Sequence, residues 1–294
     1  MRLAAVLLTL ALALAGPAPA VAQNSSDQQL ETQIGQQEYQ QLQQKGEIVA
    51  NSPYYSVLNP IAQQIKRVAD PQYYHPFQFI IVHESSPNAF AVPGGNVYVT
   101  DSLMKFVENR EELAGVLCHE TSHDIHHDVL NLYKKQQKTA TAYTIGDVLA
   151  NVLTGGKYSG AIDTVAQYGF TFQTLHFSRD VEAAADHKGA QTCAEAGSNP
   201  WGMVWLFQHF EKLNTSSPPE FMSDHPTDQD RIAALESEFR SDPQLFGRYP
   251  SSIAYAHPLS AGVTQATAAA STASYKKVAK KSKGMFPPGS GYKY

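Results

Sequence analysis

The sequence predicts an α+β protein that is mostly helical and contains a small β-sheet. Three short runs of β-forming residues predict strands at 77–82, 88–92 and 97–100. Between the second and third runs, Pro93-Gly94-Gly95 predicts a tight turn. Helical periodicity or helix-end signals recur at 54–69, 111–133, 179–196, 201–213 and 226–239. The chain has 294 residues, and we expect one large domain over residues 46–240.

The first 22 residues predict a secretory signal. Arg2 is followed by an apolar run over residues 3–14, and Ala20-Val21-Ala22 fits the small-residue cleavage rule. The run is too short for a comfortable membrane span, and no stretch of about 18 apolar residues follows it. We therefore expect an exported protein, periplasmic or secreted, with no transmembrane segment in the mature chain. A retained N-terminal anchor is the alternative.

The remaining elements follow in order. Residues 23–45 form a Gln-rich polar arm, expected to be partly helical. Asp101 is expected to cap a short helix at 101–108. Residues 134–160 contain helical pieces interrupted at Thr154-Gly155-Gly156, which makes them a candidate lid or substrate-channel loop. Gly197 should close the helix at 179–196, and Pro226 is acceptable in the first turn of the last helix.

Residues 241–294 are expected to form a low-complexity, Lys-rich, disordered tail. The net charge is −5, yet acids are absent after Asp242, and the tail carries six lysines: Lys276, Lys277, Lys280, Lys281, Lys283 and Lys293. A solubilising role and weak attachment to an anionic envelope polymer or lipid are both open for this tail. The rest of the chain has no basic face that would indicate nucleic-acid binding.

Two cysteines, Cys118 and Cys193, are too few for a disulfide scaffold. Both fall inside predicted helices. They can form one bridge in an oxidising compartment or remain two buried free thiols, and the sequence leaves both alternatives open.

The most informative motif is His119-Glu120-Thr121-Ser122-His123. On a helix, residues at i and i+4 are about 40° apart in azimuth and about 6 Å apart along the axis, so both imidazoles can point at one ion. Zinc accepts neutral histidine nitrogens in a tetrahedral shell. Glu120 would then lie beside the metal but off the ligand face, where a base can take a proton from water. The alternative is a polar helix face with two unrelated histidines.

A catalytic zinc site needs a third protein ligand, and Glu182 is the best candidate. Glu182 and Asp186 are spaced i, i+4, so they share one helix face, and the small residues Ala183 to Ala185 allow close helix approach. Glu182 can bind the ion while Asp186 holds a ligating imidazole by its other ring nitrogen. The alternative is a solvated acidic face.

Four segments occur in the order typical of one family: residues 88–95, the motif at 119–123, Ser178-Arg179 with 182–186, and His225-Pro226 with Arg231-Ile232. Over residues 30–240 the chain resembles the HtpX, BepA and Oma type of zinc metallopeptidases, which are gluzincins. The resemblance implies a zincin-like, mostly helical domain with a small β-sheet beside the HExxH helix. It also implies His119, His123 and Glu182 as ligands of one zinc ion per chain, and Glu120 as the catalytic carboxylate.

Further roles are hypotheses. His225 and Arg231 are candidates for stabilising the oxyanion of a tetrahedral intermediate. His225 is alternatively a ligand in zinc's open position that keeps the enzyme latent, or a surface histidine. The strand at 97–100 is a candidate edge for pairing with an extended substrate. His126 and His127 are expected to lie on the helix surface, because His126 is about 10 Å along the axis from His119.

The predicted function is therefore a zinc-dependent endopeptidase of the bacterial cell envelope, acting on protein or peptide substrates, with a role in protein quality control as a hypothesis. A zinc-holding scaffold or chaperone-like protein with little proteolysis is the alternative, although Glu120 argues against it because a structural site needs no base. An exported helical binding module with an accidental motif is the third hypothesis.

Overall fold

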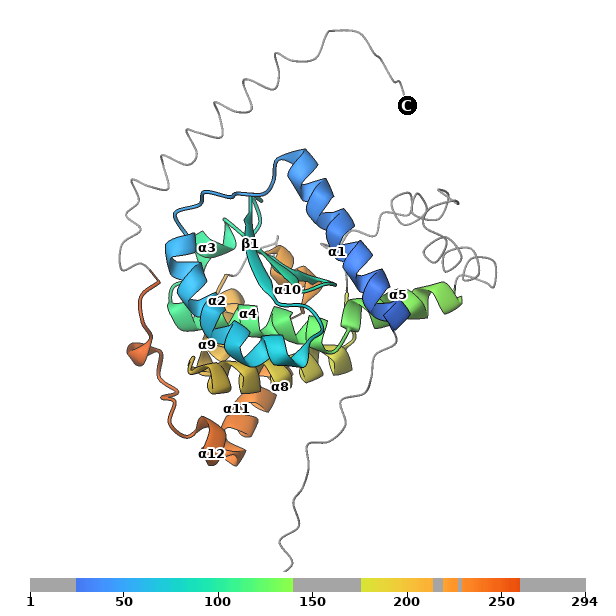
Figure 1. Ribbon diagram of the computed structural model, residues 1–294. Helices are drawn as coiled ribbons and strands as arrows, with labels where there is room; N and C mark the ends of the chain where they lie inside the picture. Colours follow the sequence, from blue (N-terminus) through green and yellow to red (C-terminus); the bar gives the residue numbers. More distant parts are fainter. Residues whose placement is uncertain (1–24, 140–175, 214–218, 227–228, 260–294) are drawn as a thin grey trace, which may run out of the picture.

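The computed structural model describes residues 25–139, 176–213, 219–226 and 229–259 (Figure 1). The expected signal at 1–22, the candidate lid beyond residue 139 and the tail from residue 260 lie outside the described residues. None of the described helices combines the length and the apolar character needed to cross a bilayer.

The described chain is mostly helical. Its longer helices are α1 (Ser25–Lys45), α2 (Tyr55–Ala69), α4 (Arg110–Ile125), α5 (Asp128–Thr139), α8 (Arg179–Ala196), α9 (Trp201–Glu211) and α11 (Gln229–Ser241). Its shorter ones are α3 (Leu103–Phe106), α10 (Glu220–Asp224), α12 (Pro243–Phe246) and the 3₁₀ turns η1 (Asp70–Gln72) and η3 (Ile253–Tyr255).

The sheet has three strands, β1 (Gln78–Val82), β2 (Ala89–Val92) and β3 (Asn96–Thr100), in the order β1-β3-β2. β1 pairs with β3 in parallel, with Ile80 opposite Tyr98, and β2 pairs with β3 antiparallel across the predicted tight turn. The expectation that residues 97–100 form an edge is therefore wrong, because β3 is the central strand. β2 is the edge strand nearest the predicted motif, since the Ala91 amide donates a hydrogen bond to Glu120.

Each face of the sheet is covered by helices. Alternate side chains on one face, including Ile80, Phe90 and Tyr98, cluster with Leu42 of α1 and Val129 of α5. The opposite face joins the main core with α2, α4 and α9. Figure 1 shows α1 crossing the sheet towards α5, with α4 at the centre of the molecule. The predicted class, a mostly helical α+β domain with a small sheet beside the motif helix, is confirmed.

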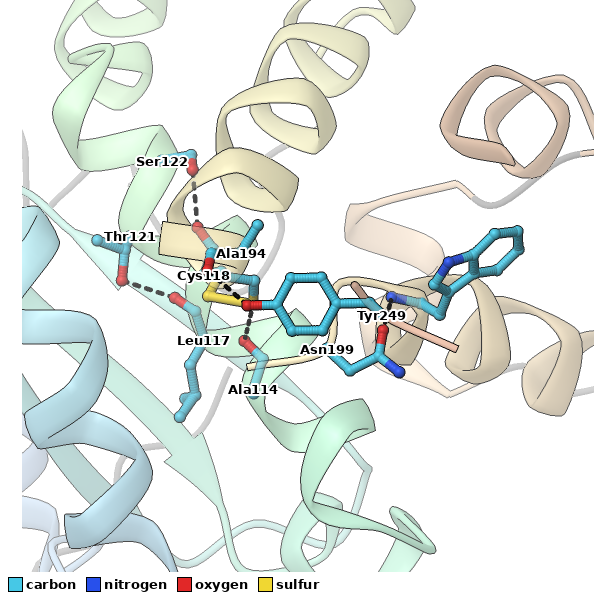
Figure 2. Close-up of a disulfide and its surroundings, with 10 residues drawn as sticks. Ala114, Leu117, Cys118, Thr121, Ser122, Ala194, Asn199 and Tyr249 are labelled. Carbon is cyan, nitrogen blue, oxygen red and sulfur yellow. Dashed lines mark hydrogen bonds between the residues drawn. A yellow bond between two sulfur atoms is a disulfide. The ribbon is translucent and has the colours of Figure 1, made fainter. Parts of the chain in front are cut away.

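Helix α4 packs closely against α8 at a glycine, where a larger side chain would be crowded. A Cβ at Gly189 would lie 3.1 Å from both Cα and N of His119, and these are backbone atoms that cannot rotate away. Close to this crossing, Cys118 and Cys193 form a disulfide with a Cα–Cα distance of 5.9 Å, so the structure favours the bridged alternative (Figure 2). The two helices that carry the predicted metal ligands are thus fixed to each other covalently.

The folded chain continues beyond the expected boundary at residue 240. Phe246 of α12 is 2% exposed and packs against Phe239 at a ring distance of 4.9 Å. The carbonyl oxygen of Ala194 at the end of α8 accepts a hydrogen bond of 2.6 Å from the Tyr249 hydroxyl (Figure 2). Residues 241–259 therefore belong to the fold, because they bury an aromatic ring and add hydrogen bonds to the carbonyl oxygen at the end of α8, which also accepts from the Gly197 amide.

The predicted helix at 111–133 is two helices. α4 ends at Ile125, and His127 adopts a left-handed conformation with φ of +56° before α5 begins at Asp128. His126 and His127 are therefore turn residues and not part of a helix surface. Asp101 does not cap α3; its carboxylate instead accepts hydrogen bonds from the Glu84 amide and Lys105.

Candidate metal centre

Four buried side chains from three parts of the chain converge on one point: His119, His123, Glu182 and His225. Nε2 of His119 lies 3.1 Å from Nε2 of His123 and 3.2 Å from Nδ1 of His225. Oxygens of Glu182 lie 3.4 Å from His119 Nε2, 3.8 Å from His123 Nε2 and 2.9 Å from His225 Nδ1. All four residues are almost completely removed from solvent.

These separations fit a tetrahedral zinc ion. Donors at about 2.0–2.1 Å from a tetrahedral ion are about 3.3–3.4 Å from one another. The five separations between donor atoms given above range from 2.9 to 3.8 Å, and this range includes the expected value. A set of three imidazole nitrogens and one carboxylate also favours zinc, because magnesium and calcium bind mainly oxygen ligands.

The local sequence explains this convergence. The Asn109 side chain accepts from the Glu112 amide and starts α4, which then carries His119 and His123 on adjacent turns of one face. Glu182 stands in the first turn of α8, which crosses α4 at Gly189. His225 follows the short helix α10, and its ring packs against Phe221 at a centroid distance of 4.9 Å.

Each motif histidine has a carboxylate at its second ring nitrogen. Nδ1 of His119 lies 3.0 Å from Asp186 Oδ1, an ion-pair contact that does not have the geometry of a hydrogen bond. Nδ1 of His123 lies 2.8 Å from Asp128 Oδ2. Such partners fix the tautomer and orientation of a ligating histidine. Asp128 was missed by the sequence analysis, because a continuous helix to residue 133 would have kept it away from His123.

Glu120 is held by the edge strand. Its Oε2 accepts a hydrogen bond of 3.0 Å from the Ala91 amide, whereas its Oε1 has no hydrogen-bond donor among the described residues and lies 3.4 Å from His225 Nε2. Burial raises the pKa of Glu120 to about 8, and the neighbouring His119 opposes the shift. Beside Glu120 is a cavity of about 10 Å³, also lined by Ala91, His123 and Asp224, which is room for about one water molecule.

The charge states of the donors follow from their surroundings. Burial raises the pKa of Glu182, but His225 and His119 outweigh it and hold the pKa below its ordinary value, so this carboxylate is ionised. Burial lowers the pKa of His225 to about 4, against the opposing effect of Glu182, so its imidazole is neutral. Burial lowers the pKa of His119, but Asp186 and Glu182 outweigh it and raise the pKa to about 10. An anionic carboxylate and a neutral imidazole are the forms that bind metal ions, so a metal ion would have to displace a proton from His119.

Arg231 lies behind the donors, in contact with Asp186 and Glu182. Its Nε and Nη2 donate to the two oxygens of Asp186 at 2.7 Å, and its Nη1 donates to the Pro226 carbonyl at 2.9 Å and lies 3.0 Å from Glu182. The guanidinium is engaged by carboxylates and a carbonyl, so the geometry does not support an oxyanion-binding role. It supports a role in holding Asp186 and Glu182 in place.

A second group, Glu108, Glu112 and His209, is also close enough to hold an ion. Here both oxygens of Glu112 accept hydrogen bonds of 2.8 Å, from the Glu108 amide and from Asn109, and Glu108 is exposed. These bonds compete with a metal, so the donor set around His119 is the stronger candidate.

A helix carrying two histidines and a glutamate, a second helix supplying a buried carboxylate, and a small sheet alongside together define a zincin-like domain. Residues 56–239, more than half of the chain, match Peptidase family M48. The chain belongs to this family of metallopeptidases.

The chain is also similar to three named proteins, in each case over part of its length. The chain is 30% identical over 164 residues to the beta-barrel assembly-enhancing protease of Yersinia pestis, which is 54% of this chain and 33% of that protein. It is 28% identical over 163 residues to the Escherichia coli K12 protein of the same name, with the same coverage. It is 30% identical over 184 residues to mitochondrial metalloendopeptidase OMA1 of Saccharomyces cerevisiae, 60% of this chain and 47% of that protein. The matched part thus spans a third to a half of these relatives.

Proposed function

We propose that this protein is a zinc-dependent endopeptidase that hydrolyses peptide bonds in protein substrates. One observation carries the proposal: the Glu182 carboxylate of α8 lies 3.4 and 3.8 Å from the Nε2 atoms of the two motif histidines, close enough for all three to share one ion. Glu120 lies in the same cluster, 3.4 Å from His225. Membership of Peptidase family M48 supports the same chemistry.

In this proposal His119, His123 and Glu182 hold one zinc ion per chain. Asp186 and Asp128 orient the two imidazoles through their second nitrogens. Arg231 holds Asp186 by a bidentate pair and so acts as a positioning residue. When bound, zinc would act as a Lewis acid that lowers the pKa of water and polarises the scissile carbonyl.

Glu120 is the proposed proton carrier. Its Oε1 is a buried acceptor beside a water-sized cavity. Without metal the pKa of about 8 keeps the carboxyl mostly protonated at neutral pH, and a bound zinc ion would favour the carboxylate form, which can take a proton from water. The Ala91 amide fixes the other oxygen, so the carboxylate keeps one orientation while the proton arrives and while it is delivered to the leaving amine. A base held in this way needs no reorganisation during the reaction.

His225 has two possible roles, and the geometry favours one of them. Its Nδ1 lies among the donor atoms, while its Nε2 lies 3.4 Å from Glu120. We infer that in this conformation His225 takes the fourth position and keeps the enzyme latent until the ring withdraws. His225→Ala should then raise peptidase activity. Unchanged or lower activity would count against latency, and only lower activity would favour stabilisation of the oxyanion by His225.

We place this activity in the bacterial cell envelope, with an export signal over residues 1–22. The Cys118–Cys193 disulfide is consistent with an oxidising compartment. Two relatives are named beta-barrel assembly-enhancing proteases, and we propose that envelope proteins are the substrates of this chain, which would serve their quality control. An extended substrate would pair with β2, the edge strand that also holds Glu120.

The proposal is tested by cleavage of casein or a quenched fluorescent peptide by the zinc-loaded full chain. Glu120→Gln is the matched control, because it preserves the shape of the side chain and leaves the proposed ligands intact. Loss of a general base should lower the rate about 10²–10⁴-fold while zinc content is unchanged. A zinc-loaded protein without measurable cleavage, or equal cleavage by both proteins, would favour the scaffold alternative.

A further inference from the structure

Helix α1 lies outside the segment that matches the family, yet it contacts the turn behind the metal centre. The family match begins at residue 56, whereas α1 spans Ser25–Lys45. Glu31 on its inner face is only 1% exposed. Nδ1 of His127, in the turn between α4 and α5, lies within hydrogen-bond distance of Glu31 Oε1, at 2.8 Å. Figure 1 shows α1 reaching the start of α5 at this point.

The backbone at His127 is unfavourable without support. With φ of +56°, it is the one non-glycine residue with positive φ in the described part of the chain. This conformation is usual for glycine and less unfavourable for asparagine, aspartate and histidine than for other residues, but it still costs free energy that surrounding contacts offset. Besides Glu31, the ring contacts Tyr73 at a centroid distance of 5.3 Å, and the carbonyl of His127 accepts from the Asn131 amide at 2.9 Å.

The same turn places a partner against a proposed metal ligand. Because the turn at His126 and His127 interrupts the helix, α5 starts at a new angle to α4, and Asp128 Oδ2 lies 2.8 Å from His123 Nδ1. Had α4 continued as a regular helix, residues 123 and 128 would be about 140° apart around its axis. The geometry of the turn is therefore required for the contact between Asp128 and His123.

We propose that Glu31 of α1 is a positioning residue for the metal centre, acting through His127 and Asp128 on His123. Glu31 stabilises the left-handed turn, the turn aims Asp128, and Asp128 fixes the imidazole. This inference rests on the proposed zinc site, and it adds to that site a contribution from a helix outside the matched segment. Docking of α1 would thus set zinc affinity as well as cover the sheet.

A purely structural role for α1 makes a different prediction, and the helix offers a matched control. Glu38 is also buried, at 8% exposure, and lies two turns along the same inner face. If α1 only covers the sheet, Glu31→Gln and Glu38→Gln should affect zinc binding equally. If Glu31 acts through His127, only the first change should weaken it.

The test is zinc competition between a chromophoric chelator and the full chain, with folding monitored by circular dichroism. Asp128→Asn is the reference, because loss of such a partner weakens metal binding about 10–100-fold. Glu31→Gln and His127→Ala should each weaken it by a smaller factor, about three- to tenfold, since alanine lacks the imidazole and disfavours the left-handed backbone. The double variant should be no weaker than the weaker single variant, because the two residues share one contact.

Unchanged affinity in Glu31→Gln, or equal losses in Glu31→Gln and Glu38→Gln, overturns the inference while leaving the zinc site intact. If Glu31→Gln does not fold, His127→Ala alone decides: wild-type affinity overturns the inference and weakened binding supports it. Failure of the unaltered protein to bind zinc overturns both the inference and the proposed function.

Discussion

Replacing Gly189 by alanine tests whether the α4–α8 crossing sets the geometry of the metal centre. The added Cβ would lie 3.1 Å from N and Cα of His119 and 3.2 Å from the carbonyl carbon of Cys118. Carbon atoms prefer about 3.5–4.0 Å, so the helices must separate by several tenths of an ångström at the residue that carries a proposed ligand. The Cys118–Cys193 disulfide resists that separation.

Two opposing terms give the expected magnitude. Glycine to alanine inside a helix normally stabilises by about 0.8–1 kcal/mol. Inserting a methyl group into a tightly packed core costs about 1–3 kcal/mol, and here the contacted atoms belong to the backbone. We therefore expect a net loss of about 1 kcal/mol in the free energy of unfolding, together with weaker zinc binding, because His119 moves relative to Glu182.

Urea unfolding in the presence of a chelator measures the first quantity and zinc competition measures the second. Ala184→Gly, on the exposed face of the same helix, calibrates the local helix propensity without any clash. It should cost about 1 kcal/mol and leave zinc binding unchanged. A Gly189→Ala protein that is more stable than the unaltered chain and binds zinc equally well would refute the idea that this crossing fixes the site.

Three further predictions follow from individual contacts. Arg231→Gln should destabilise the protein by about 3–5 kcal/mol in urea unfolding, because it leaves the buried carboxylate of Asp186 without its bidentate partner; wild-type stability would contradict this. Phe246→Ala should cost about 3–5 kcal/mol if the fold extends past residue 240, and an unchanged unfolding midpoint would contradict that extension. Burial and the neighbouring Glu220 raise the pKa of Glu84 to about 8. Below about pH 4 the Glu84 carboxyl is protonated in both the folded and the unfolded state. As the pH rises towards about 8 the unfolded state releases this proton first, so the free energy of unfolding falls. Melting temperatures between pH 5 and pH 8.5 should therefore fall less in Glu84→Gln than in the unaltered chain, and equal slopes would contradict the assignment.

The donor residues that lie in strong local patterns were predictable from the sequence. The i, i+4 spacing on a helix fixes the directions of His119 and His123 whatever surrounds them, and the structure brings them together. Glu182 and Asp186 depended on a weaker pattern, and the order of motifs along the chain was needed to select them. Their actual approach depends on Gly189, whose importance becomes visible only when the two helices are packed.

The missed features arise from tertiary contacts. No glycine, asparagine or proline marks the break after Ile125, and His127 adopts its left-handed conformation between Glu31 and Tyr73, which are distant in sequence. The only local hint was Asp128 followed by an apolar pair, which is a helix-start signal. The order of the strands was similarly hidden, although the fully buried run at 97–99 is typical of a central strand.

Metal analysis of the purified full chain addresses the central claim most directly. The two histidines of α4 and Glu182 of α8 form one donor set, which predicts about one zinc ion per chain in the unaltered protein. Glu182→Gln should lose most of this zinc, whereas Glu120→Gln should retain it. A protein without stoichiometric zinc, or a Glu182→Gln variant that binds as much zinc as the unaltered chain, would contradict the assignment of this site.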